Sequence, residues 1–199
     1  QSRDYDVWRQ LGNTGWGWDD VLPYFIKAEN QERGKNEFHG TGGPLSVSDQ
    51  RIQLPLLNEF QNAAEEFGIP KTKDFNTGDN NGCGYFQVTE KDGFRCSTAV
   101  GYLNPIKKRG NLKIVTNAHV KKINFQNKIA KEVEYWQDNE VKKLVVNREI
   151  ILSSGSIGSP QILQTSGIGN ANKLNKLGIE VVQELKGVGE NLQDHLMFR

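Results

Sequence analysis

The sequence predicts a fold that combines α/β with α+β architecture, and three patterns carry this prediction. Residues 54–67 place apolar side chains at a helical spacing. From Asn111 onward, short β-like runs follow one another with polar turns between them, which favours an antiparallel meander. The apolar run Ile150–Leu152 enters a turn of small residues and then a helix start, which is typical of an α/β unit.

The N-terminal part predicts two short helices within residues 4–30, separated by a turn at Asn13–Gly15. Negative charge suits the start of the second helix, and Asp19–Asp20 supply it there. Trp16 and Trp18 could line a cavity, but two tryptophans in one short segment favour a hydrophobic core. A glycine-rich loop over 31–43 and a strand over 44–48 follow.

The middle of the sequence predicts one helix and one long loop. The helix over 54–67 should end at Gly68, because glycine favours the backbone conformation that terminates helices. Residues 71–84 are polar and predict a loop of a length that is often functional. A strand over 85–89 and a short helix over 97–103 are expected next.

Five β-like runs are expected in the second half, and Ser159–Pro160 is expected to begin the helix after the last of them. The runs are Leu112–Thr116, Val120–Phe125, Ala130–Trp136, Val141–Val146 and Glu149–Leu152. Lysine-rich stretches in this half and before it are interpreted as solvated turn and edge charges.

Length, charge and cysteine content exclude several classes of protein. The 199 residues suffice for one or two domains, and 25 basic against 24 acidic residues give no general attraction for nucleic acid. Cys83 and Cys96 cannot form a four-ligand zinc site, so no metal is expected; a disulfide between them is permitted but not implied. Apolar runs stay far below the roughly 18 residues that span a bilayer. We expect a cytoplasmic or peripheral membrane-associated protein.

The sequence begins at Gln1 without an initiator methionine, and its single methionine is Met197. It has no signal-peptide pattern at the start and no polar tail at the end. We therefore expect the chain to be a piece of a longer polypeptide.

The connection after Ile150–Leu152 has the geometry in which backbone N–H groups at a helix start meet a phosphate or nucleotide. An α/β crossover turn that uses small residues for close packing explains it equally well. The following pattern is more specific: Gly155-Ser156-x-x-Ser159-Pro160-x-Ile162-Leu163-x-x-Ser166-Gly167-Ile168-Gly169. At all ten defined positions it resembles the second signature of the glucose-methanol-choline (GMC) flavoprotein oxidoreductases.

Further stretches along nearly the whole chain resemble the same family, with most similarity to its choline dehydrogenase and alcohol dehydrogenase branch. They include Asp4-Tyr5-Asp6-x-Trp8, Gly15-Trp16-x-Trp18-x-Asp20-Val21-Leu22-Pro23-Tyr24-Phe25, His39-Gly40-x-x-Gly43-Pro44-Leu45, Arg95-x-Ser97-Thr98 and Gly187-Val188-Gly189-Glu190-Asn191-Leu192-Gln193-Asp194-His195.

The resemblance implies FAD as cofactor and a Rossmann-like FAD-binding domain interleaved with an antiparallel-sheet substrate domain. Residues 1–43 would then form a helical and loop connection of the FAD domain. Residues 44–109 would form the first part of the substrate domain, 110–158 would return to the FAD domain, and 159–199 would form the second part of the substrate domain.

The resemblance also implies cofactor-binding residues in this chain. The position of Val120 places its backbone against the adenine, although an ordinary strand valine is the alternative. Ser154–Gly155 would pack near the adenosine, with Ser154 where the family commonly has alanine.

No catalytic residue is expected in this chain, because the family's catalytic pair would follow residue 199 and its GxGxxG motif would precede residue 1. Three histidines are present. His39 is interpreted as a structural hydrogen-bonding residue and His119 as solvent-facing. His195 could pair with Asp194, and a loop-fixing role is favoured over proton transfer.

The function implied is oxidation of an alcohol, choline-like or another primary alcohol, to a carbonyl by hydride transfer to flavin. The partners are then the alcohol and the remaining N- and C-terminal parts of the same polypeptide, with an electron acceptor that the sequence does not indicate. This chain alone should be inactive. The alternative is a stand-alone, non-catalytic binding module. If the chain is a stand-alone module, its apolar surface should be covered. If it is a portion of a larger enzyme, apolar side chains should be exposed along an unpaired sheet edge.

Overall fold

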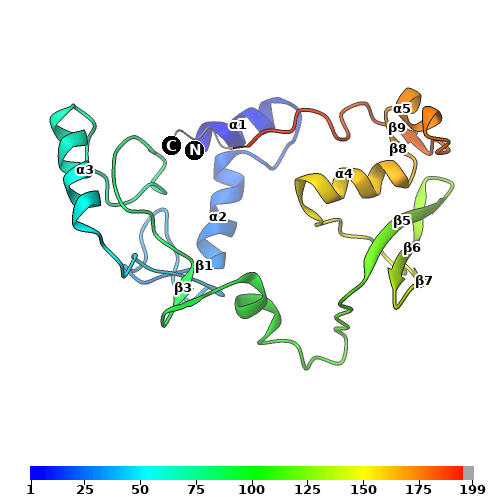
Figure 1. Cartoon of the computed structure of the whole chain (residues 1–199), viewed down its shortest axis with the longest axis horizontal. Coiled ribbons are helices and arrows are strands. Elements are labelled where there is room, and N and C mark those ends of the chain that lie inside the picture. Colours follow the sequence, from blue (N-terminus) through cyan, green and yellow to red (C-terminus); the bar gives the residue numbers. More distant parts are fainter. Residues whose placement is uncertain (195–199) are drawn as a thin grey trace. The chain divides into compact units, whose positions relative to one another are not determined.

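A computed structural model describes residues 1–194 of the chain, which form two compact units. The first unit spans Gln1–Lys113, and the second begins at Ile114. Helices and strands occur in both units, so the predicted mixture of α and β structure is confirmed (Figure 1).

The first unit opens with helices α1 (Ser2–Gln10) and α2 (Trp18–Ala28), as the sequence predicted. The backbone N–H of Gly17 donates to Asp20 Oδ2 at 3.0 Å, which caps the start of α2. The N–H of Trp18 donates to Asp6 Oδ1 at 3.2 Å and so ties the two helices together.

Aromatic rings fill the space between these helices. The ring of Tyr5 lies 5.8 Å from that of Trp18 and 5.8 Å from that of Phe25, measured between centroids. Trp16 packs edge-on against Trp8 but keeps 53% of its surface exposed. The core interpretation is therefore wrong for Trp16, because the turn at 13–15 carries it to the outer side of the aromatic cluster.

Two short parallel strands follow, β1 (Glu29–Gln31) and β2 (Leu45–Val47), and they confirm the strand predicted over 44–48. The connection between them passes so close to α2 that only glycine fits. A Cβ atom added at Gly40 would lie 1.8 Å from the carbonyl oxygen of Ile26. This close passage fixes the loop that carries His39.

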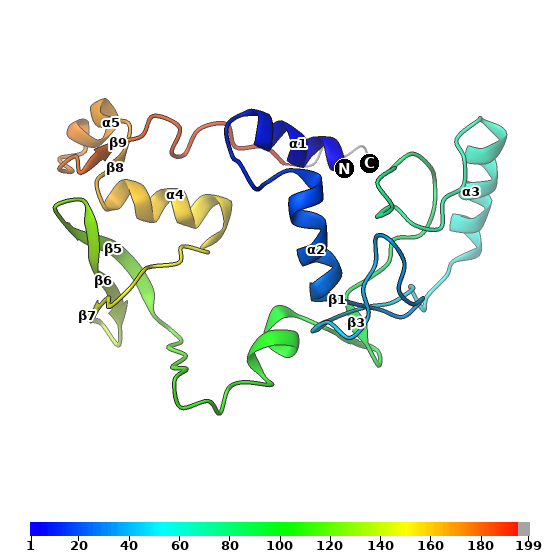
Figure 2. The ribbon, with the colours of Figure 1, turned by 180° about the vertical axis from the view of Figure 1, so that it is seen from behind.

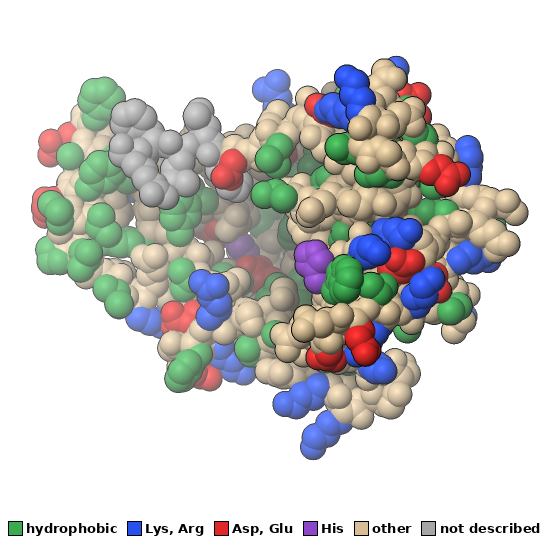
Figure 3. All heavy atoms as spheres, turned by 45° about the vertical axis from the view of Figure 1, so that its right-hand side comes forward, with side chains coloured by type: hydrophobic (Ala, Val, Ile, Leu, Met, Phe, Trp, Pro, Cys, Tyr) green, Lys and Arg blue, Asp and Glu red, His purple; other side chains and the backbone are tan. Residues whose placement is uncertain are grey.

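Helix α3 (Pro55–Glu66) confirms the predicted helix, and Gly68 ends it with φ +97°. The N–H of Ile69 donates to the carbonyl of Ala64 at 2.8 Å, as in a glycine-terminated helix. The apolar face of α3 is open: Leu56 is 79% exposed. Hydrophobic side chains gather over this region in Figure 3.

Residues 71–84 form the expected long loop. The strand predicted over 85–89 is wrong, because only Val88 pairs, through reciprocal hydrogen bonds of 2.9 Å with Ser48. Strands β3 (Glu90–Lys91) and β4 (Phe94–Arg95) form a hairpin, and the π-helix η1 (Ala99–Leu103) occupies most of the short helix predicted over 97–103.

The second unit contains an antiparallel sheet of β5 (His119–Gln126), β6 (Ile129–Gln137) and β7 (Glu140–Val145), in that order. Two-residue turns join the strands. Asn127–Lys128 and Asp138–Asn139 all have positive φ, between 49° and 63°, which matches the right-handed twist of a hairpin.

Three of the five predicted runs are therefore strands, and two predictions are wrong. Residues 112–116 and 149–152 form no strand in the described part of the chain. A run of apolar residues becomes a strand only when a neighbour accepts its hydrogen bonds, and neither run has one among the described residues. Ile151 is accordingly 80% exposed.

Helix α4 (Gly155–Thr165) lies along this sheet, and Figures 1 and 2 show it beside β5 from opposite sides. The helix begins at Gly155, so the start predicted at Ser159–Pro160 is wrong and Pro160 lies within the helix. The small residues before Pro160 let the backbone coil one turn earlier, and Ser159 Oγ accepts a hydrogen bond from the N–H of Ser154 at 3.0 Å.

The unit ends with β8 (Ile168–Gly169) parallel to β9 (Gln183–Glu184), connected through α5 (Ala171–Lys176). Leu174 on α5 is the most buried side chain described, at 2% exposure. Few hydrophobic side chains of the described residues are buried, namely Cys96, Ile123, Ile162 and Leu174, while many large ones are exposed. Within residues 1–194, no helix is long and apolar enough to cross a membrane.

Candidate functional site

Ser154 directly precedes α4 and Gly155 is its first residue, and both are exposed. Gly155 has φ +79°, and a Cβ atom added there would meet no heavy atom within 4 Å. The space beside the Cα atom of Gly155 is therefore open.

The chemistry of this helix start suits a polar or anionic group of a nucleotide. The first N–H groups of a helix have no partner within the helix, and the helix dipole favours negative charge beside them. The first turn of α4 carries no acidic side chain that would compete for this position. These residues therefore fit a cofactor that lies against the backbone.

Val120 lies on β5, half-buried and opposite Tyr135 of β6. The register shifts between Val120 and Lys122, which marks a β-bulge at Lys121. The carbonyl of Lys121 accepts a hydrogen bond from Thr165 Oγ1 at 3.0 Å, so the bulge turns the strand toward α4.

The described hydrogen bonds between β5 and α4 lie at the C-terminal end of the helix, at Thr165 and Ser166. The structure thus places Val120, Ser154 and Gly155 in one packed unit without a direct hydrogen bond between Val120 and the other two. The sequence analysis did not predict the bulge or a role for Thr165, because nothing in the alternation of apolar and polar residues along β5 marks the extra residue.

A cavity of about 580 Å³ lies beside α4, between the helix and residues 187–193. Gln164 Nε2 donates to the carbonyl of Val188 at 3.1 Å and holds this segment against the helix. A Cβ atom added at Gly189 would lie 2.6 Å from Gln164 Nε2, so glycine permits the contact. The role of Gln164 was not predicted, because it falls at an undefined position of the ten-position pattern.

The histidines and cysteines lie as follows. His39 is 3% exposed and its ring contacts Glu29 Oε2 at 2.8 Å and Asp74 Oδ2 at 2.9 Å, which confirms a structural hydrogen-bonding role. His119 is exposed, as predicted, and His195 lies outside the described residues. Both cysteines are free. Among residues 1–194, no group of three or more acidic, histidine or cysteine side chains could hold a metal ion.

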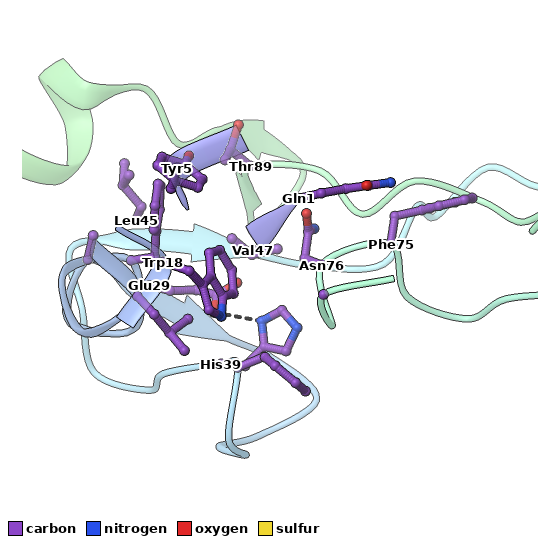
Figure 4. A pocket seen from close by; sticks show the side chains of 15 residues that line it. Gln1, Tyr5, Trp18, Glu29, His39, Leu45, Val47, Phe75, Asn76 and Thr89 are labelled. Atoms are coloured by element: carbon purple, nitrogen blue, oxygen red, sulfur yellow. Dashed lines mark hydrogen bonds and ion pairs between the residues drawn. The ribbon is translucent and has the colours of Figure 1, made fainter. Parts of the chain in front are cut away.

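A second cavity, of about 330 Å³, lies within the first unit (Figure 4). Aromatic and aliphatic side chains form most of its wall, and its polar residues are Gln1, Glu29, His39, Asn76 and Thr89. The aromatic residues are Tyr5, Trp18, Phe25, Phe38 and Phe75. Trp18 therefore lines a cavity, the option that its sequence context disfavoured.

A network of charged side chains lies on the β5-β6-β7 sheet, away from both of these cavities. Asn124 Nδ2 donates to Glu132 Oε1 at 2.7 Å and to Glu134 Oε1 at 2.8 Å. These hydrogen bonds, together with the nearby Lys143, lower the pKa of both carboxyl groups below its ordinary value. On the face visible in Figure 3, basic and acidic side chains are interspersed, as expected for cross-strand pairs.

Comparison with known proteins agrees with the motifs. Residues 1–197 match the GMC oxidoreductase family. The chain is 44% identical over 195 residues to mitochondrial choline dehydrogenase of Mus musculus, covering 98% of this chain and 33% of that protein. It is 41% identical over 196 residues to an alcohol dehydrogenase [acceptor] of Pseudomonas putida, covering 97% of this chain and 36% of that protein.

The fold is similar as well. An FAD-dependent oxidoreductase from Chaetomium thermophilum superposes with a TM-score of 0.85 at 32% sequence identity, over 94% of this chain and 35% of that protein. The fold and site thus define a part of a flavoprotein oxidoreductase. This chain belongs to the GMC oxidoreductase family, and it spans about a third of the length of the relatives that it matches. FAD is the cofactor that the family and its structural neighbours support.

Proposed function

We propose that this chain is the central portion of an FAD-dependent enzyme that oxidises an alcohol to a carbonyl compound, with choline or another primary alcohol as substrate. The observation that carries the proposal is the open, small-residue start of α4, a helix whose C-terminal end is hydrogen-bonded to β5, in a chain of the GMC oxidoreductase family. The names of the choline and alcohol dehydrogenase relatives support the substrate class.

In this proposal the backbone of Val120 contacts the adenine, and Ser154 and Gly155 accommodate the adenosine. FAD supplies the acceptor for the hydride that leaves the carbinol carbon. The hydroxyl proton passes to a base outside this chain, because the proposal assigns no catalytic residue to residues 1–199. The role of this chain is thus to help bind and orient the FAD. Alone, the chain should be inactive.

The domain organisation belongs to the same proposal. Residues 1–43 and 110–158 would contribute to a Rossmann-like FAD-binding domain, and residues 44–109 and 159–199 to an interleaved substrate domain. Residues 112–116 and 149–152 are apolar runs without a strand partner among the described residues. Strands from the rest of the polypeptide would supply the hydrogen bonds that these runs lack.

The alternative, a stand-alone binding module, is less well supported. A module that folds alone should cover its apolar surface. Leu56 and Phe60 on α3 are 79% and 65% exposed, and Leu144 and Val145 on the edge strand β7 are 59% and 70% exposed. Such surfaces favour burial by further parts of the same protein.

The test uses the full-length polypeptide that contains this chain. Purified protein should carry flavin, seen as absorbance near 450 nm and identified as FAD after release, and choline or a simple primary alcohol added without oxygen should bleach it. Flavin that no alcohol reduces would contradict the proposed substrate class but would agree with FAD as the cofactor. A full-length protein without FAD would overturn the proposal itself.

A further inference from the structure

Charge is distributed unevenly along the middle of the chain. Between Asp92 and Glu132 the sequence has no acidic residue but nine basic ones. The whole chain has 25 basic and 24 acidic residues, so its composition does not account for a stretch of one sign. The nine are Arg95, Lys107, Lys108, Arg109, Lys113, Lys121, Lys122, Lys128 and Lys131.

Some of these side chains have partners and others have none. On β5, Lys121 Nζ lies 3.7 Å from Glu134 Oε2, and Lys128 Nζ donates to Gln183 Oε1 at 2.9 Å. Four others are exposed, and within residues 1–194 none of the four forms an ion pair or a side-chain hydrogen bond. These four form what we call the basic patch: Lys107, Lys108, Arg109 and Lys113.

Consecutive turns give the backbone of the basic patch a defined shape. The N–H of Ile106 donates to the carbonyl of Leu103 at 3.0 Å, and the N–H of Arg109 donates to the carbonyl of Ile106 at 2.9 Å. The N–H of Leu112 donates to the carbonyl of Arg109 at 3.1 Å. Ile106 and Leu112 are half-buried, whereas the four basic side chains reach solvent.

Helix η1 fixes this segment on the first unit. A Cβ atom added at Gly101 would lie 2.5 Å from the carbonyl oxygen of Pro44, so the helix lies directly against the residue before β2. The N–H of Asn104 donates to the carbonyl of Ala99 at 2.8 Å and continues the helix into the turns. In Figure 1 the segment is the green loop that follows this helix. The charges are therefore presented from a fixed base.

The basic patch should stay at the surface of the complete protein. Further parts of the polypeptide can cover exposed apolar side chains at little cost. Covering unpaired cations is costly, because each one taken out of water needs an acidic partner. An anionic partner in water meets the same four charges without that cost.

The surroundings of the basic patch favour a membrane as this partner. Tyr102 and Leu103 on η1 directly precede the turns, and they are 42% and 39% exposed. Basic residues beside aromatic and aliphatic ones are typical of segments that lie at the membrane–water interface. The patch lines neither of the two cavities described above, so no pocket selects a small ligand there. A broad anionic surface needs no pocket.

We propose that the basic patch, with Tyr102 and Leu103 beside it, docks the complete protein on a membrane that contains anionic lipids. The four basic side chains contact lipid phosphates and carboxylates, and the two apolar side chains lie among the headgroups. The association is peripheral and depends on salt. It is independent of the reaction proposed above.

Co-sedimentation of the full-length polypeptide with lipid vesicles tests the docking. One set of vesicles contains phosphatidylcholine alone, and the other contains equal amounts of phosphatidylcholine and phosphatidylserine. The wild type should sediment with the mixed vesicles and stay in solution with phosphatidylcholine alone. Added salt should release it, because salt screens interactions between exposed charges.

Two triple variants separate the patch from the total charge. The patch variant combines Lys107→Gln, Lys108→Gln and Lys113→Gln, and its partition onto the mixed vesicles should fall by about a hundredfold. The matched control combines Lys27→Gln, Lys35→Gln and Lys91→Gln, which removes the same charge from exposed lysines elsewhere in the first unit and should bind as the wild type does. Both variants should unfold at the temperature of the wild type, since none of these side chains forms an ion pair within residues 1–194.

Three results would overturn the proposal. The first is a wild type that does not sediment with the mixed vesicles, or that sediments equally with phosphatidylcholine alone. The second is an equal loss of binding in the patch variant and in the control. The third is retention on immobilised polyglutamate without binding to either vesicle, which would indicate an acidic protein as the partner.

Discussion

Ile123 of β5 donates its backbone N–H to Ser166 Oγ at 2.8 Å, and both residues are buried. The donor lies in the middle of strand β5 and the acceptor directly follows α4, so this hydrogen bond fixes the helix on the strand. The two residues are 43 positions apart in sequence. The position of the candidate cofactor site therefore depends on a bond that no local pattern specifies.

Replacing Ser166 with alanine leaves the N–H of Ile123 buried without an acceptor, which costs about 1–3 kcal/mol. We expect the amides of β5 to exchange roughly ten- to a hundredfold faster in the full-length polypeptide. Thr165→Val is the control, because that neighbouring hydroxyl is exposed and its carbonyl partner at Lys121 can turn to water. Equal acceleration in both variants would contradict the assigned role of Ser166.

Gly155 tests the proposed cofactor site. Valine at φ +79° costs about 1–2 kcal/mol in backbone strain and fills the space in front of α4. We expect Gly155→Val to weaken FAD binding of the full-length protein by about tenfold or more, measured as flavin retained on dilution. Gly178→Val introduces similar strain at φ +69°, with no heavy atom within 4 Å of the new Cβ, but at the end of α5. Flavin loss of equal size in Gly178→Val would show that strain alone is responsible.

Acid should weaken the sheet first around Glu132 and Glu134. Their pKa values are lowered in the folded protein, chiefly by the hydrogen bonds from Asn124, so ionisation stabilises the fold above the ordinary value of 4.5. This contribution is lost as pH falls below 4.5 through the lowered values. Hydrogen exchange in β5 and β6 should accelerate in that range, and Asn124→Ala should reduce the pH dependence. An unchanged acid profile in Asn124→Ala would refute the assignment.

Gly40 tests the close passage between the His39 loop and α2. An alanine Cβ would lie 1.8 Å from the carbonyl oxygen of Ile26, and a backbone atom cannot give way as a side chain can. We expect Gly40→Ala to lower the free energy of unfolding by about 3 kcal/mol or more. The change should be seen as lower thermal stability and lower yield of the full-length protein. Gly42 has φ +80°, and a Cβ atom added there would meet no heavy atom within 4 Å. Gly42→Ala should therefore lower the free energy of unfolding by only about 1 kcal/mol. Similar losses in the two variants would argue against steric exclusion at Gly40.

Much of the local structure could be predicted from the sequence. The apolar spacing over 54–67 and Gly68 predicted α3 with its termination, and the three central β-runs predicted β5, β6 and β7. These predictions succeed because helix periodicity and two-residue turns depend on neighbours in the sequence. The start of α4 was placed one turn too late, because proline signals a helix start more strongly than the glycine and serines before it.

By itself, the sequence determined most of the helices, the turns between the sheet strands and the family, because dihedral preferences and short motifs are local properties. Only the tertiary structure decided that Ile151 has no strand partner among the described residues, that Lys121 forms a bulge facing α4, and that His39 meets Glu29 and Asp74 from 10 and 35 positions away. The physical reason is that strand pairing and buried charge pairing both require a partner. A partner is brought by the fold, and the same residues behave differently when it is absent.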